Sequence, residues 1–211
     1  MHVSLICTVR DEADTIAALL DSMLAQTRPP DEIVVNDCLS VDATPAIVRA
    51  YAARDPRIRL VSGGHNIASG RNNAIAAARG PIVASTDAGL TLDPGWLAAL
   101  VAPIEAGAAD LVGGFYRPDP RSLFELTLGA VNYRALGEID PASFLPFGNC
   151  MAFRKELWER VGGFPEWLDH SEDLFFDLAA ERAGFRRAFA PDAQIAFRPR
   201  GSLRAFARQY Y

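Results

Sequence analysis

Polar side chains stand at the ends of three apolar runs that have the length of a buried strand. Thr8 and Arg10 lie at the end of the first run, Asp37 ends the second, and Asp87 comes directly after the fourth. Hydroxyl and carboxylate oxygens bind polar ligands, and carboxylates are common ligands of divalent cations such as Mg²⁺. We therefore expect Asp87 to hold a ligand rather than only to close a turn.

Strand-length runs alternate with helical patterns through the first half of the chain. The expected strands are 3–9, 32–37, 58–63 and 81–86, and the expected helices are 12–26, 44–54, 68–79 and 93–107. Short apolar strands that alternate with helices are typical of an α/β fold with a mainly parallel sheet and helices on both faces. Ligands of such sheets bind at the carboxyl ends of the strands. Thr8, Asp37 and Asp87 are expected to meet there.

The second half of the chain is less regular. We expect a strand over 109–118, a helix over 122–137, a loop rich in Pro and Phe over 139–150, and a helix over 171–184. Thr44, Asp93 and Ser171 are expected to cap the helices that follow them, because short polar side chains accept hydrogen bonds from the first free N–H groups of a helix.

Glu172 and Asp173 occupy the first turn of the helix expected over 171–184. Acidic residues there stabilise a helix by about 0.3–1 kcal/mol through its dipole. A carboxylate is also a suitable general base. From these residues alone the structural explanation is the stronger one, and Asp177, one turn further on, is expected on an exposed helix face.

Several common catalytic motifs do not occur in the sequence. There is no GxGxxG after the first strand, no GxxxxGK[ST] and no GxSxG, and the three histidines lack metal-ligand spacing. These absences disfavour a dinucleotide-binding Rossmann site, P-loop chemistry and a serine hydrolase. Carboxylates remain as the residues able to do chemistry.

Charge and cysteine content limit the partners and the compartment. The net charge of −5 argues against nucleic acid, and three cysteines without CxxC spacing predict a reduced, cytoplasmic protein. From Arg182 to the end, however, seven arginines face a single acid, Asp192. This basic end suits a phosphate-bearing ligand or an anionic membrane surface, or is simply a solvated helix face.

Three stretches occur in a distinctive order. Residues 3–37 read VSLICTVRDEADTIAALLDSMLAQTRPPDEIVVND, residues 70–89 read GRNNAIAAARGPIVASTDAG, and residues 148–186 read GNCMAFRKELWERVGGFPEWLDHSEDLFFDLAAERAGFR. Together they resemble the GT-A-fold, inverting glycosyltransferases of the large family-two group, over nearly the whole chain. The resemblance implies transfer of a sugar from a nucleoside-diphosphate sugar to an acceptor hydroxyl, as in polysaccharide or glycolipid biosynthesis.

The resemblance also implies a nucleotide site. It assigns Asp87 to a divalent cation, Mg²⁺ or Mn²⁺, that bridges the diphosphate, and Asp37 to a hydrogen bond from the nucleobase. Thr8 belongs to the same pocket, and Arg71 is similar to the family's arginine near the nucleotide, although a helix-surface arginine is the alternative. Arg10, at the end of the first strand, completes the candidate nucleotide-binding set.

The catalytic and acceptor residues follow from the third stretch. Its Glu-Asp pair is similar to the family's, so the resemblance favours Asp173 as the catalytic base, with Glu172 as its neighbour. Removal of the acceptor proton by Asp173 while the sugar leaves the diphosphate gives single displacement with inversion. Trp167, expected in a loop, is a candidate for stacking on the acceptor sugar.

The sequence also departs from the family pattern. The family's Asp-x-Asp is Asp87-Ala88-Gly89 here, so a second carboxylate is missing, and no histidine occurs in FRPRGS, where many relatives place another metal ligand. Either Asp87 alone holds the ion through the diphosphate and waters, or metal binding is weak and side chains such as Arg198 or Arg200 carry part of the diphosphate charge.

We expect residues 1–110 to form a nucleotide-sugar-binding half and 111–211 an acceptor-binding and catalytic half of one continuous domain. The acceptor is expected to be a saccharide or a lipid-linked molecule, and the basic C-terminal segment 202–211 to dock on a bilayer or to lead into a longer natural chain. The rival functions are a catalytically degenerate nucleotide-sugar-binding protein and a nucleotidyltransferase. A nucleotidyltransferase would need a Gly-rich loop after the first strand, and residues 7–15, CTVRDEADT, contain no glycine.

Overall fold

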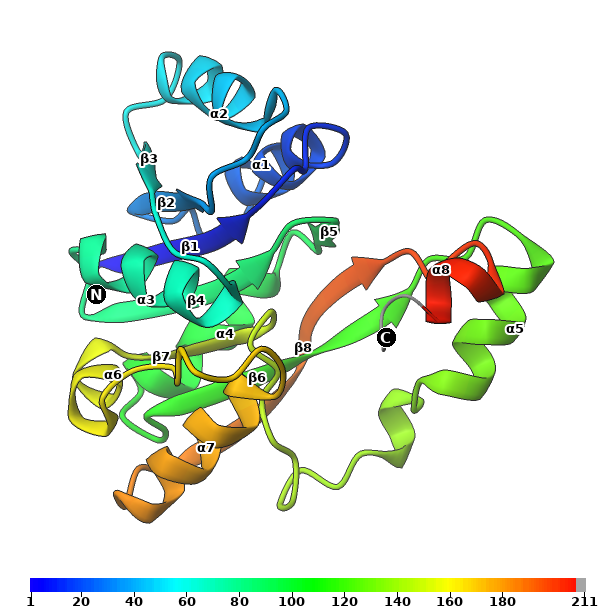
Figure 1. The fold of residues 1–211 in the computed structure, drawn as a ribbon. Coiled ribbons are helices and arrows are strands. Elements are labelled where there is room, and N and C mark those ends of the chain that lie inside the picture. The colour runs from blue at the N-terminus through cyan, green and yellow to red at the C-terminus, as the bar shows by residue number, and fades with distance from the viewer. Residues whose placement is uncertain (208–211) are drawn as a thin grey trace.

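The computed structural model describes residues 1–207, which fold around a single eight-stranded sheet with the order β3-β2-β1-β4-β7-β6-β8-β5 (Figure 1). The strands are β1 Val3–Val9, β2 Glu32–Asp37, β3 Ile58–Ser62, β4 Ile82–Asp87, β5 Leu90–Leu92, β6 Leu111–Pro118, β7 Met151–Arg154 and β8 Arg187–Phe197. The neighbours β3, β2, β1 and β4 are parallel. This confirms the parallel sheet expected for the first half of the chain.

The helices follow the order expected from the sequence. They are α1 Ile16–Leu24, α2 Thr44–Ala52, α3 Ile67–Ala77, α4 Trp96–Glu105, α5 Leu123–Asn132, α6 Lys155–Val161, α7 Glu172–Arg182 and α8 Leu203–Ala207, with a 3-10 turn at Leu136–Glu138. The single helix expected over 122–137 is therefore wrong in its second half, because α5 ends at Asn132 and an extended segment precedes the 3-10 turn.

Two apolar clusters lie on opposite faces of the sheet. Alternate side chains of β1 enter different clusters: Leu5 and Cys7 pack in the one that includes residues of α1, α2 and α4, and Ile6 packs in the one that includes residues of α3, α6 and α7. Strands buried on both faces are the reason that the sequence reads as continuous apolar runs. The layered α/β architecture expected from the sequence is confirmed.

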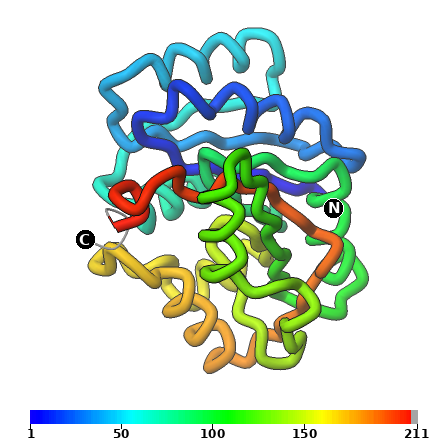
Figure 2. Tube along the Cα trace, turned by 90° about the vertical axis from the view of Figure 1, so that its right-hand side faces the viewer, coloured from blue at the N-terminus to red at the C-terminus, as the bar shows by residue number. Residues whose placement is uncertain are grey.

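The second half of the sheet contains antiparallel strands. β7 runs antiparallel to both β4 and β6, and the short β5 runs antiparallel to β8. The sequence did not predict β5, since its three residues are fewer than a recognisable strand pattern requires. β6 and β8 are parallel to each other and extend beyond the layered core towards α5, which stands in front of the sheet in Figure 2.

Three expected helix caps are not formed, because their side chains contact other elements or adopt another conformation. The Thr44 hydroxyl accepts a hydrogen bond from the Glu12 backbone N–H, and the Asp93 carboxylate accepts one from Arg117. Ser171 does occupy the N-cap position of α7, but its φ of 64° is left-handed and its side chain makes no cap bond. Tertiary contacts thus replace local capping at Thr44 and Asp93.

Candidate functional site

The carboxyl ends of β2, β1 and β4 lie side by side and bring three of the expected site residues together. Thr8 is paired in register with Asp87 on one side and with Asn36 on the other, and Asp37 follows next to Val9. The Thr8 hydroxyl is buried and has no hydrogen-bond partner among residues 1–207. Such a group is suited to accept a ligand contact at this edge of the sheet.

Asp37 and Arg10 differ in accessibility at this edge. The Asp37 carboxylate accepts the Ser40 backbone N–H at 3.3 Å, and the residue is 4% exposed, whereas Arg10 is exposed. Asn36 donates from its side-chain amide to the Gly63 carbonyl at 2.9 Å. Asn36 therefore links β2 to the loop after β3.

Arg71 lies in α3, which packs against one face of the sheet next to these strand ends. α3 begins at a capping box in which Asn66 accepts from the Ser69 N–H. Gly70 then lets the helix approach β1 and β2 closely, since a Cβ there would lie 2.5 Å from both Thr8 Cγ2 and Cys38 Sγ. This close packing brings the next residue, Arg71, into the interior.

The Arg71 guanidinium joins carboxylates from two distant parts of the chain. Its Nη2 lies 3.2 Å from Asp87 Oδ1 and its Nη1 lies 2.8 Å from Glu172 Oε1. Arg71 is 2% exposed and its guanidinium lies 5.0 Å from the centre of the Phe164 ring. Burial disfavours the charged guanidinium, but Asp87 and Glu172 outweigh this effect and raise the Arg71 pKa. The expected contact of Arg71 with the nucleotide stays a prediction.

Glu172 and Asp173 are adjacent in sequence but have different surroundings. Glu172 is buried against Arg71, whereas Asp173 accepts the Gly148 backbone N–H at 3.0 Å. A side chain at position 148 is excluded, because a Cβ there would lie 2.6 Å from Arg71 Nη1. Gly148 thereby connects the loop 139–150 to both Arg71 and Asp173.

Asp173 reaches a cavity of about 340 Å³ that has aromatic walls. The residues that line it are Leu90, Tyr116, Tyr133, Phe147, Asn149, Asp173, Ile195 and Phe197. The Asn149 Oδ1 atom is buried and has no hydrogen-bond partner in the described part of the chain. Aromatic surfaces with a few polar atoms are typical of small-molecule sites, and sugar rings pack well on such faces. The cavity therefore places a carboxylate where a polar, ring-shaped ligand fits.

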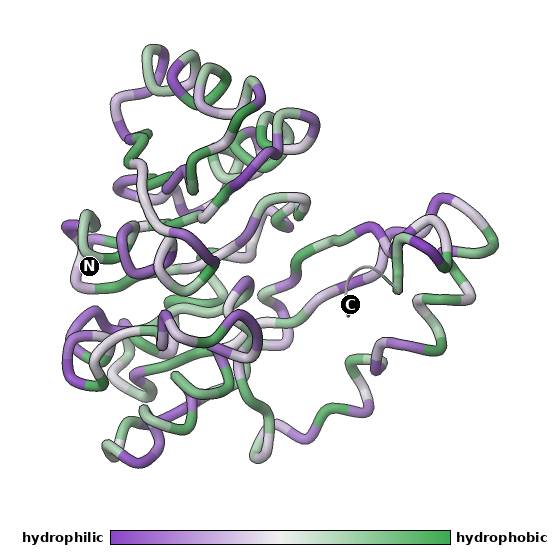
Figure 3. The backbone as a smooth tube through the Cα atoms, viewed as in Figure 1, coloured by the Kyte–Doolittle hydropathy of each residue, from purple (hydrophilic) through white to green (hydrophobic). Residues whose placement is uncertain are grey.

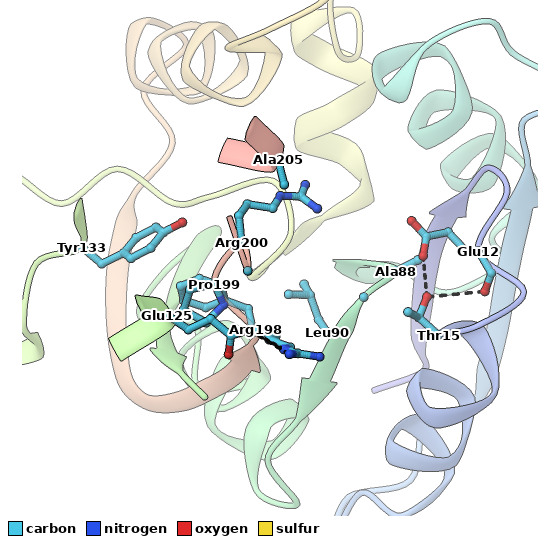
Figure 4. Close-up of a pocket in the computed structure, with 13 residues that line it drawn as sticks. Glu12, Thr15, Ala88, Leu90, Glu125, Tyr133, Arg198, Pro199, Arg200 and Ala205 are labelled. Atoms are coloured by element: carbon cyan, nitrogen blue, oxygen red, sulfur yellow. Dashed lines mark hydrogen bonds and ion pairs between the residues drawn. The ribbon is translucent and has the colours of Figure 1, made fainter. Parts of the chain in front are cut away.

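A second cavity, of about 590 Å³, lies beside the end of β4 (Figure 4). One wall consists of Glu12 and Thr15 together with Ala88 and Gly89, the residues directly after Asp87. The opposite wall comes from α5 and from the segment between β8 and α8, and its polar residues are Glu125, Tyr133, Arg198 and Arg200. The sequence did not identify Glu12 or Glu125 as site residues.

The end of β4 provides one carboxylate, Asp87, which is too few ligands for a metal site formed by the protein alone. Asp87 is already paired with Arg71, Gly89 has no side chain, and no group of three or more His, Cys, Asp or Glu residues suited to a metal ion occurs among residues 1–207. A divalent cation here has Asp87 as its single candidate strand-end ligand.

Trp167 lies in a loop that α3 holds in place. Trp167 is 74% exposed, and its ring lies 5.7 Å from that of Phe175. Asn72 makes four hydrogen bonds: it donates to the Phe164 carbonyl and to Glu166, and it accepts from the Phe164 N–H and from Trp158. The GRNN stretch gave no indication of this role for Asn72, since its partners are about ninety residues away in sequence.

Asp177 is buried, which corrects its expected place on an exposed helix face. The residue is 1% exposed, and neither carboxylate oxygen has a hydrogen-bond partner within the described residues. Burial, with a further contribution from Asp173, raises the Asp177 pKa to about 8, and Arg187 opposes this shift. Asp177 also lines a cavity of about 240 Å³ between α7 and the start of β8.

The sequence matches the model of the Glycosyl transferase family 2 over residues 4–162. The chain belongs to this family. The similarity to solved structures confirms the GT-A type of fold expected from the sequence, with a mostly parallel sheet and some antiparallel strands.

Individual relatives of this family-2 chain come from bacteria and archaea. It is 38% identical over 111 residues to the succinoglycan biosynthesis protein ExoO of Rhizobium meliloti, and this match covers 52% of the chain and 31% of ExoO. It is 28% identical over 197 residues to the glycosyltransferase AglE of Haloferax volcanii, which covers 90% of the chain and 64% of AglE. The chain thus spans less than two thirds of either relative.

A solved structure of similar fold is that of the mannosyltransferase PcManGT from Pyrobaculum calidifontis in complex with GDP-Man and Mn²⁺. The TM-score is 0.72 at 27% identity, and the match covers 92% of this chain and 56% of PcManGT.

The raised pKa of Asp177 predicts a pH-dependent loss of stability. The folded chain keeps the Asp177 proton up to about pH 8, whereas the unfolded chain releases it near the ordinary pKa of 3.8. Between these values the folded state binds more protons, so the contribution of Asp177 to the free energy of unfolding falls as pH rises. Asp177→Asn is expected to raise that free energy by about 1 kcal/mol or more at pH 9 and to change it little at pH 4.

Urea unfolding of the parent and of Asp177→Asn across this pH range measures the effect. Asp192→Asn is the control, because Asp192 is exposed. A difference between Asp177→Asn and the parent that does not vary with pH would contradict the prediction.

Proposed function

We propose that this chain transfers a sugar from a nucleoside-diphosphate sugar to an acceptor hydroxyl by a single inverting displacement. The observation that carries the proposal is the bridge from Asp87, at the strand ends, through Arg71 to the helix that bears Asp173. This bridge supports a donor site at the strand ends, because it joins Asp87 to the helix whose Asp173 lines the aromatic cavity. Family membership and the similarity to a GDP-Man complex support the reaction class.

In the proposed reaction Asp173 is the base. The acceptor hydroxyl oxygen attacks the anomeric carbon, its proton passes to the Asp173 carboxylate, and the bond from the anomeric carbon to the diphosphate oxygen breaks. The electron pair of that bond leaves with the nucleoside diphosphate. Attack opposite to the leaving group inverts the anomeric configuration. Glu172 acts as a positioning residue, because its carboxylate is bonded to Arg71.

We assign residues 1–110 to the donor and 111–211 to the acceptor and to catalysis. Thr8, Arg10 and Asp37 lie at or just beyond the strand ends, where the nucleoside of the donor is proposed to bind. Arg71 holds Asp87 at these strand ends through an ion pair. The proposed site for the diphosphate lies beside Asp87. A divalent cation, Mg²⁺ or Mn²⁺, would bind together with the donor, and Asp87 would be its protein ligand. No step of the displacement is assigned to the cation.

The proposed acceptor is a saccharide or a lipid-linked molecule. The aromatic cavity next to Asp173 offers ring-stacking faces, and the Trp167 indole is exposed on the loop held by Asn72. The name of ExoO, a succinoglycan biosynthesis protein, supports a saccharide product for a relative of this chain.

The proposal includes binding to an anionic membrane surface through α5 and α8. Leu123, Leu126 and Val131 are 79%, 54% and 80% exposed, and Figure 3 shows hydrophobic stretches along α5. The only charged residue of α5, Glu125, points inward instead. Residues 117–138 and 198–207 contain six arginines and three acidic residues in a chain of net charge −5. Apolar side chains flanked by arginines are typical of interfacial helices.

None of the helices in residues 1–207 has the length and apolarity that crossing a bilayer demands. The basic C-terminal segment expected to dock on a bilayer is described up to Ala207, and its residues 208–211 lie outside the described part of the chain.

Replacing the proposed base tests the reaction. Asp173→Asn is expected to lower turnover about 10²–10⁴-fold while donor affinity changes little, because a general base contributes to the transition state and not to nucleotide binding. Turnover of UDP-, GDP- and dTDP-sugars with a panel of acceptors, together with donor titration, measures both. The exposed Asp192→Asn serves as the matched control. Donor binding without turnover by the parent chain would favour a degenerate binding protein instead.

Co-sedimentation with vesicles tests the membrane surface. The chain is expected to bind vesicles that contain anionic lipid more tightly than neutral ones, and Leu126→Gln is expected to weaken this binding several-fold by removing an apolar contact. Val41→Gln is the control, since Val41 is 92% exposed in the segment between β2 and α2, far along the chain from α5. Equal binding of the parent and of both variants would contradict the assignment.

A further inference from the structure

The cavity beside Ala88 and Gly89 carries two arginines opposite the end of β4. Figure 4 shows the Arg198 and Arg200 side chains between the side formed by Glu125 and Tyr133 and the side formed by Ala88 and Glu12. Both arginines come from the segment that links β8 to α8. A guanidinium presents paired N–H donors that match two oxygens of a phosphate group. The cavity therefore contains hydrogen-bond donors suited to an oxyanion.

Arg198 is held in place by a buried carboxylate. Its Nε and Nη2 atoms lie 3.0 and 2.8 Å from Glu125 Oε1. Glu125 is 1% exposed, and its other oxygen accepts the Arg121 backbone N–H at 2.6 Å. Arg198, and after it Arg121, lower the Glu125 pKa, so this carboxylate stays charged. An arginine oriented by a charged partner loses less side-chain freedom when it binds an anion.

The acidic groups of the cavity are already engaged. Glu125 bonds to Arg198, and on the opposite wall the Glu12 carboxylate accepts the hydroxyl of Thr15. The neighbouring Asp87 is paired with Arg71. The anionic groups around the cavity thus each have a donor within the protein, and the two arginines face the space between the walls.

The end of β4 has few groups that could hold a cation to neutralise a diphosphate in place of these arginines. Gly89 has a φ of 78°, a left-handed conformation that glycine adopts freely and that strains most other side chains. The backbone there disfavours the second carboxylate that the Asp-x-Asp pattern of the family supplies. The one remaining carboxylate, Asp87, already neutralises part of the Arg71 charge.

We infer that Arg198 and Arg200 bind the diphosphate of the donor, and that nucleoside diphosphates bind this chain without a divalent cation. This inference rests on the proposed function and names the groups that neutralise its leaving group. Of the two alternatives raised by the missing carboxylate, a cation held by Asp87 alone or arginines that carry part of the diphosphate charge, it favours the arginines. Arg198 is positioned by Glu125, and the ligand class is a nucleoside diphosphate or its sugar ester.

Calorimetric titration of the full chain with UDP, GDP and dTDP, in EDTA and then in Mn²⁺ or Mg²⁺, tests the inference. The nucleotide that binds is expected to lose less than about 10-fold in affinity on removal of the cation, which corresponds to less than about 1.4 kcal/mol. Arg198→Ala and Arg200→Ala are each expected to weaken binding in EDTA about 10-fold or more. Arg204→Ala, an exposed arginine of α8 that does not line the cavity, is expected to change nothing.

Arg198→Ala leaves the Glu125 carboxylate without its cation, so circular dichroism is used to check that this variant is folded. Arg198→Lys keeps the positive charge and is expected to bind nucleotide with intermediate affinity. Binding that requires a divalent cation and is unchanged in the arginine variants would overturn the inference but leave the proposed function intact. Absence of nucleotide binding in both conditions would overturn the proposed function as well.

Discussion

The structure depends on one buried cation, the guanidinium of Arg71. A buried charge is tolerated only when it is well paired, and here Asp87 and Glu172 supply the pairing from opposite ends of the site. Glu172 is 101 residues away from Arg71 in sequence. The ion pairs therefore attach the start of α7, and with it Asp173, to the edge of the parallel sheet. They act together with the β4–β7 pairing and the Asn72 hydrogen bonds, which also join the first half of the chain to the second.

The rotation of α7 explains why two adjacent acids have different surroundings. Successive helical residues are about 100° apart, so Glu172 turns toward Arg71 while Asp173 turns toward the aromatic cavity. Favourable interaction with the helix dipole and a catalytic role are compatible here, since the dipole stabilises both carboxylates whatever their contacts. Gly148 completes the arrangement, because only a residue without a side chain passes between Arg71 and Asp173.

Regular patterns allowed much of the fold to be predicted, and long-range contacts account for what was missed. The parallel strands follow from apolar runs and helical spacing, which are local properties. Asp177 was misplaced because α7 carries apolar residues on several sides, including the exposed Leu174 and Phe175, so its buried face is not readable from the sequence. The roles of Asn72 and Gly148 depend on partners brought close only by folding.

A double-mutant cycle on Arg71 and Glu172 tests this account most directly. Arg71→Met alone is expected to lower the free energy of unfolding by about 3–5 kcal/mol, because it leaves two carboxylates without their cation. Addition of Glu172→Gln should recover part of this loss, giving a coupling energy of about 1–3 kcal/mol, whereas the exposed pair of Arg117 and Asp93 should give about 0–1 kcal/mol. Additive effects of Arg71→Met and Glu172→Gln would contradict the central role of the Arg71 bridge.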